Sequence, residues 1–191
     1  MQASHDWRFS CAIVGATRSG KTCLMRALLG ESFSPLSSSS SSSLSSSSGD
    51  GAYYQTLGAE FATIESTANG ESVAVDMTCL PGTWRLLPLT QLHLRDKLDA
   101  VVVVYAVNSV DSFKETPFWV NEASRMAPGC LIVLVGTHAD KSFKVNGADA
   151  LMQAKVWGGR AYTLSSKTCR GVDEFKDAFF MDLVRAKGHV V

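Results

Sequence analysis

The 191-residue chain carries 18 basic and 18 acidic side chains, so its formal net charge is zero at pH 7. This balance argues against bulk electrostatic binding to nucleic acid or to an acidic membrane, and we expect no nucleic-acid partner. The length predicts a single domain, residues 1–191, with ample core. The five cysteines form no C-x-x-C pair, which predicts reduced thiols in a cytoplasmic protein and no zinc site.

A phosphate-binding motif lies near the start of the chain. Gly15 to Thr22 reads G-x-x-x-x-G-K-[ST] between an apolar run at 9–14, typical of a buried strand, and a helix-like run at 23–29. Backbone N–H groups of such a loop cradle phosphates, Lys21 would reach the β- and γ-phosphates, and Thr22 would bind Mg²⁺. Arg18 would face either the phosphates or solvent. We therefore expect nucleotide contacts from Thr17, Arg18, Ser19, Gly20, Lys21, Thr22 and Cys23.

Residues 34–50 form a low-complexity segment, with serine at every position of 37–43 and of 45–48. Serine buries too little apolar surface to offset the entropy lost on ordering, so this segment predicts a disordered insertion in a loop. A phosphorylated switch is the alternative, which is suggested by the position of the segment just before a nucleotide-sensing loop.

Two strand-like segments, 58–66 and 71–79, flank Asn69-Gly70, and Asn-Gly is the strongest short signal for a hairpin. We therefore expect these strands to pair in an antiparallel direction. The following residues contain Pro81, Gly82 and Pro88 as breakers, and then a short helical stretch that ends near residue 95.

The rest of the chain alternates between apolar runs and amphipathic stretches. The runs at 99–107 and 130–136 have no polar face, which predicts central strands covered on both sides. A short strand is expected at 160–164, and helices are expected at 112–126, 148–157 and 172–187. This order predicts an α/β fold of three layers, whose six-stranded sheet is mostly parallel with one antiparallel edge strand.

Three further motifs suggest which nucleotide binds. Gly136-Thr137-His138-Ala139-Asp140 follows the second apolar run, Leu164-Ser165-Ser166-Lys167 follows the short strand, and Tyr53 to Phe61 reads YYQTLGAEF before the hairpin. They resemble the [NT]-K-x-D, S-A-K and T-[IL]-G-x-[DE]-F elements of the Ras superfamily of small GTPases, and they are most similar to those of its Rab-like members. The resemblance covers the chain from about Phe9 to Arg185.

This resemblance implies a small G domain with a phosphate loop that binds GTP or GDP together with Mg²⁺. Asp140 would accept hydrogen bonds from the two guanine nitrogens that adenine does not present, and the wrong base would leave its carboxylate unpaired. Thr56 would complete the Mg²⁺ shell and sense the γ-phosphate. The backbone N–H of Ser166 would bind the guanine oxygen. The other implied contacts come from Gly82, Thr137, His138, Ser165 and Lys167, with histidine at a position where lysine is commoner.

The family's helix start is also recognisable at Asp111-Ser112-Phe113, and Asp111 is the candidate for the helix cap.

The element expected after the hairpin departs from the family pattern D-x-x-G-Q. Gly82 fits, but Cys79 and Thr83 stand where the magnesium-facing aspartate and the water-orienting glutamine are expected. Asp76 lies three residues before Cys79, so on a regular strand it faces the opposite side of the sheet. We therefore expect GTP hydrolysis to be slow or absent, with no assigned catalytic residue. Pro81 and Trp84 also suggest a second switch that is stiffer than usual or differently placed.

The chain shows neither the apolar core of a signal peptide at its start nor a cysteine near its end, so we expect no direct lipid anchor. The S-G-K-T ending of the phosphate loop and the altered D-x-x-G-Q element resemble the intraflagellar-transport subgroup of Rab-like proteins. This implies a nucleotide-dependent subunit or adaptor, in the cytoplasm or the cilium, that acts with a protein effector or a multi-subunit assembly. Two alternatives stay open: an active GTPase switch in vesicle trafficking, and a nucleotide-independent scaffold that keeps only the fold.

Overall fold

The strands and helices follow the order that the sequence predicts. A computed structural model describes residues 6–33, 58–68, 70–95 and 97–188. The serine-rich segment at 34–50 and Thr56 lie outside these residues. The described elements are β1 (Trp7–Gly15), α1 (Lys21–Leu28), β2 (Glu60–Ala68), β3 (Glu71–Cys79), η1 (Trp84–Leu86), α2 (Leu87–Leu94), β4 (Ala100–Ala106), α3 (Val110–Lys114), α4 (Thr116–Met126), β5 (Leu131–Thr137), α5 (Gly147–Val156), β6 (Arg160–Thr163) and α6 (Val172–Gly188).

The described strands form one sheet in the order β2-β3-β1-β4-β5-β6. The β2–β3 pair is antiparallel, whereas β3–β1, β1–β4, β4–β5 and β5–β6 are parallel. The predicted hairpin and the predicted α/β fold, with one antiparallel edge strand, are therefore confirmed. Because β1, β4, β5 and β6 run the same way, their carboxyl ends lie along a single edge of the sheet, where ligands of such folds bind.

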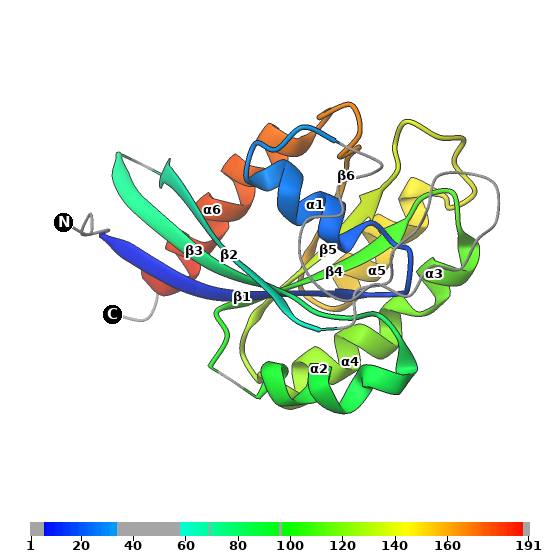
Figure 1. Cartoon of the computed structure of the whole chain (residues 1–191), viewed down its shortest axis with the longest axis horizontal. Helices are drawn as coiled ribbons and strands as arrows, with labels where there is room; N and C mark the ends of the chain where they lie inside the picture. Colours follow the sequence, from blue (N-terminus) through cyan, green and yellow to red (C-terminus); the bar gives the residue numbers. More distant parts are fainter. Residues whose placement is uncertain (1–5, 34–57, 69, 96, 189–191) are drawn as a thin grey trace.

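Helices cover both faces of this sheet, which gives three layers (Figure 1). Side chains of α1 and α6 pack on one face, and those of α2, α4 and α5 pack on the other. The side chains of β4 are buried on both faces, with Val102 in the first core and Val103 in the second. A strand with two buried faces needs apolar residues at every position, which explains its uninterrupted apolar sequence. None of the helices in the described residues has the length and apolar character needed to cross a membrane.

Three local predictions need correction. The helix expected at 112–126 is two helices, α3 and α4, which meet at Glu115. Pro117 lies in the first turn of α4, where its missing N–H costs nothing, so it favours a new helix start at that point. Pro88 likewise lies in the first turn of α2 and begins that helix instead of breaking one.

The third correction concerns the cap of α3. The N-cap is Ser109, whose side-chain oxygen accepts a hydrogen bond from the backbone N–H of Ser112 at 3.3 Å. Asp111 lies inside the first turn, where its charge favours the positive end of the helix dipole without capping a backbone group.

Candidate nucleotide-binding site

The phosphate loop connects the carboxyl end of β1 to the first turn of α1. Gly15 has φ 141°, and a Cβ there would lie 2.1 Å from the carbonyl oxygen of Val104 on β4. Gly20 has φ 88° and is the N-cap of α1. Both positions require glycine because their backbone conformations are strained for other residues and, at Gly15, because β4 leaves no room for a side chain. The backbone can therefore turn tightly at the edge of the sheet.

Lys21 folds back over this loop. Its Nζ donates to the carbonyl oxygens of Gly15 at 3.0 Å and of Ala16 at 2.8 Å. Burial lowers the pKa of Lys21 to about 8, because the protein interior disfavours the ammonium ion. A phosphate group placed on the loop would favour the charged form of Lys21. The loop therefore holds a buried ammonium group that is suited to bind an anion.

The turn after β3 approaches the phosphate loop closely. The hydroxyl of Thr17 donates to the carbonyl oxygen of Gly82 at 2.9 Å. A Cβ on Gly82 would lie 2.4 Å from the oxygen of Gly15 and 2.5 Å from Nζ of Lys21. The structure thus brings Gly82 against the cradle of the phosphates. Arg18 has φ 63° and is exposed at the crest of the loop.

A hydrogen bond joins the phosphate loop to the Gly136–Asp140 motif at the end of β5, called the base motif below. The hydroxyl of Thr137 lies 2.6 Å from the carbonyl oxygen of Ser19, and its longer contacts are to the oxygen of Tyr105 at 3.1 Å and to Nδ1 of His138 at 2.9 Å. A hydroxyl donates one proton, so we assign it to the closest acceptor, Ser19. Burial lowers the pKa of His138, which favours the neutral ring beside Thr137.

Asp140 and Ser165 are joined across the ends of β5 and β6. The hydroxyl of Ser165 donates to Oδ1 of Asp140 at 2.6 Å, and this bond is the main reason that the pKa of Asp140 is lowered. Asp140 is exposed, so its charged carboxylate faces outward in a fixed orientation. Lys167, two residues after Ser165, is exposed. Ser166 is buried, and its hydroxyl has no hydrogen-bond partner among the described residues.

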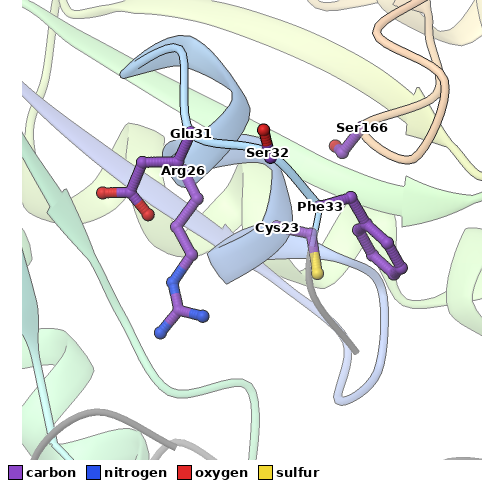
Figure 2. Close-up of a pocket in the computed structure, with 6 residues that line it drawn as sticks. All are labelled: Cys23, Arg26, Glu31, Ser32, Phe33 and Ser166. Atoms are coloured by element: carbon purple, nitrogen blue, oxygen red, sulfur yellow. The ribbon is translucent and has the colours of Figure 1, made fainter. Parts of the chain in front are cut away.

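A small hollow lies between α1, the residues after it and the Ser166 turn (Figure 2). Its volume of about 20 Å³ admits little more than one water molecule. It is lined by Cys23, Arg26, Glu31, Ser32, Phe33 and Ser166.

Phe33 belongs to no motif that the sequence revealed, yet it lies with Cys23 and Ser166 at this side of the site. The ring is 41% exposed, so a flat ligand can reach it. An aromatic residue shortly after the helix that follows the phosphate loop is the signal that could have identified it.

The surroundings of Thr22 differ from the expected magnesium site at one described position, residue 79. The hydroxyl of Thr22 is a suitable ligand, but the atom beside it is Sγ of Cys79 at 3.8 Å. Burial raises the pKa of the Cys79 thiol to about 11, so the sulfur is neutral. Mg²⁺ requires oxygen ligands and favours carboxylates. In the described part of the chain no group of three or more His, Cys, Asp or Glu side chains could hold a metal.

Asp76 does not replace the missing carboxylate. Its oxygens accept hydrogen bonds from the guanidinium of Arg8 at 2.6 and 2.8 Å and from the hydroxyl of Thr63 at 2.8 Å. These partners hold it on the sheet face opposite Cys79, as the alternation of the strand predicts. Thr83 precedes η1, and the ring of Trp84 packs on Phe118 with centroids 4.5 Å apart, so α4 supports this turn.

Comparisons with known proteins identify the family. The model of the Ras family matches residues 10–186, so the chain belongs to the Ras family. It is 29% identical to Ras-related protein Rab-30 of Homo sapiens over 137 residues, which cover 71% of this chain and 59% of that protein. It is 22% identical to Ras-related protein Rab-13 of Canis lupus familiaris over 191 residues, which cover 98% of this chain and 86% of that protein.

Ras-related protein Rab-21 of Geodia cydonium is 29% identical over 134 residues, which cover 69% of this chain and 56% of that protein. The chain thus spans less than two thirds of the length of several Rab relatives that it matches. The predicted Rab-like resemblance is confirmed at the level of a Rab-like small GTPase of the Ras superfamily.

The bond between Thr137 and Ser19 gives a first prediction. In Thr137→Val the buried carbonyl of Ser19 loses its donor, so we expect the affinity for a fluorescent GDP analogue to fall about tenfold in an equilibrium titration. Thr137→Ser keeps the hydroxyl and should stay within about threefold of the unchanged chain. Equal affinity in the valine variant would contradict the coupling of the two loops.

Proposed function

We propose that this chain binds GTP and GDP and holds the triphosphate much longer than a hydrolytic switch does. The observation that carries the proposal is the link between an oriented carboxylate, Asp140, and the phosphate loop. The turn that contains Asp140 is hydrogen-bonded to the phosphate loop. The short bond from Thr137 to Ser19 connects the two halves. Base recognition and phosphate binding therefore share one rigid edge of the sheet.

The proposed base selectivity follows from the chemistry of Asp140. A carboxylate can only accept hydrogen bonds, and guanine presents two N–H donors on one edge where adenine does not. The bond from Ser165 occupies Oδ1 and fixes the plane of the group. Phe33, beside Cys23 and Ser166, is suited to cover one face of a purine ring. Guanine is thus the base that this edge favours.

Asp140→Asn tests this assignment. An amide presents one donor and one acceptor, so guanine loses a hydrogen bond while xanthine, with an oxygen in place of the amino group, gains one. We expect GTP affinity to fall by roughly 30-fold or more and XTP to become the better competitor for the site. Asp177→Asn, on the exposed side of α6, is the matched control and should change neither affinity. An unchanged preference for GTP would remove Asp140 from base recognition.

Slow hydrolysis is the second part of the proposal. Attack on the γ-phosphate needs a positioned water, and positioning together with charge stabilisation supplies most of the catalysis in phosphoryl transfer. Thr83 has a short hydroxyl where a long amide is expected, and Trp84 is held against Phe118, which limits how far this turn can move. This turn therefore lacks both the reach and the freedom to orient water at the phosphate.

Single-turnover hydrolysis of GTP measures this consequence. We expect a slow rate in the unchanged chain and a rise of at least about tenfold in Thr83→Gln, since a positioned side chain commonly contributes that much or more. Thr83→Leu has a similar volume to the glutamine variant but no amide, and it should not accelerate the reaction. Hydrolysis by the unchanged chain that is as fast as in Thr83→Gln would contradict the proposal.

A protein partner completes the proposed role. Phe61 on β2 is 68% exposed and contacts His93 of α2 edge-on, with ring centroids 5.7 Å apart, and Leu92, the residue before His93, is exposed as well. Apolar side chains grouped in this way are typical of protein contacts. An adaptor in an assembly such as intraflagellar transport and a switch in vesicle trafficking both require such a surface. We favour the adaptor because slow hydrolysis suits a lasting complex.

A further inference from the structure

The phosphate cradle of this chain contains a fixed cation, and the thiol of Cys79 lies beside Thr22 where the family pattern has an aspartate. We propose that the chain retains guanine nucleotide without depending on a divalent cation. This inference rests on the proposed function, which supplies the nucleotide, and it extends that function to the way the negative charge of the phosphates is balanced.

The cation of the cradle is the ammonium of Lys21. An ammonium has three N–H donors, and the carbonyls of Gly15 and Ala16 take two of them. The third is available to a phosphate oxygen. Because Lys21 is 8% exposed and held by two bonds, little side-chain entropy is lost when the phosphate binds. The chain thus carries its own positive charge to the place where the phosphates would lie.

The neighbouring position determines whether a second cation is needed. Cys79 ends β3 opposite Ile13 of β1, so it reaches the same edge of the sheet as the loop, and its Sγ is 3.8 Å from Oγ1 of Thr22. An acidic side chain at this point attracts a metal when one is bound, but it repels the phosphates when the metal is removed. A thiol is a soft ligand that suits Mg²⁺ poorly. Cysteine at this position therefore lacks both the attraction that a carboxylate exerts on Mg²⁺ and the repulsion that a carboxylate exerts on the phosphates when Mg²⁺ is absent.

Three other acidic groups must be considered near the cradle, and the charge of one of them, Glu60, acts on Cys79. Glu60 is opposite Cys79 across the hairpin, but it belongs to the edge strand β2, about 4.8 Å further from β1 than β3 is. Asp76 is paired with Arg8 on the other face of the sheet. Glu115, where α3 ends and α4 begins, acts on Lys21 through its charge. None of these described carboxylates has the position of an acidic side chain at residue 79.

Release of a fluorescent GDP analogue tests the inference directly. The full chain is loaded, chased with excess unlabelled GDP, and followed by fluorescence in excess Mg²⁺ and in excess EDTA. We expect the two release rates to agree within about threefold. Cys79→Asp should make release at least about tenfold faster in EDTA than in Mg²⁺, because it restores the charge that only a metal can offset. Cys79→Asn has the same shape without the charge and should respond to EDTA as weakly as the unchanged chain.

Acceleration of release by about tenfold or more when EDTA is added to the unchanged chain would overturn the inference, whatever the variants do. If Glu60→Gln then abolished the acceleration, the carboxylate of the edge strand would be serving the metal, and the inference would equally be wrong. Failure of the unchanged chain to bind the GDP analogue in either buffer would reject the proposed function itself. Tight binding that is sensitive to EDTA would reject the inference alone.

Discussion

The close approach of three backbone segments around Lys21 is the constraint on which the site depends. Gly15 lies against β4, and Gly82 lies against Gly15 and the lysine nitrogen, with no space for a side chain at either glycine. Only then can Lys21 reach the two loop carbonyls that hold it. The bonds from Thr17 to Gly82 and from Thr137 to Ser19 attach this core to the turn after β3 and to the base motif. The proposed phosphate binding and base recognition would therefore both depend on one packed junction.

The architecture was predictable because its signals are local and strong. The uninterrupted apolar residues of β4 specify a strand buried on both faces, and Asn69-Gly70 indicated the antiparallel hairpin. The family could be recognised because the phosphate loop, the Gly136–Asp140 motif and the Leu164–Lys167 motif each directly follow a predicted strand. The split between α3 and α4 was missed because the apolar pattern continues through Glu115, while Pro117 and the Ser109 cap act on the backbone.

The candidate site was less predictable than the fold. Lys21, Asp140 and Ser165 have motif signals, but the bond that links Thr137 to Ser19 joins residues 118 positions apart and cannot be read from spacing. Phe33 has no motif of its own, and its place beside Ser166 emerges only when α1 packs on the sheet. The thiol of Cys79 could be identified as a departure from the pattern, whereas its contact with Thr22 required the structure.

We propose that this Ras-family domain binds a guanine nucleotide and hydrolyses GTP slowly. The central claim is the binding of guanine nucleotide at this edge of the sheet. The most direct test is to purify the chain without added nucleotide, denature it and identify by chromatography what is released. The account predicts GDP or GTP in an amount that approaches one per chain, and far less from Lys21→Ala. Adenine nucleotide, or equal amounts from both proteins, would contradict it.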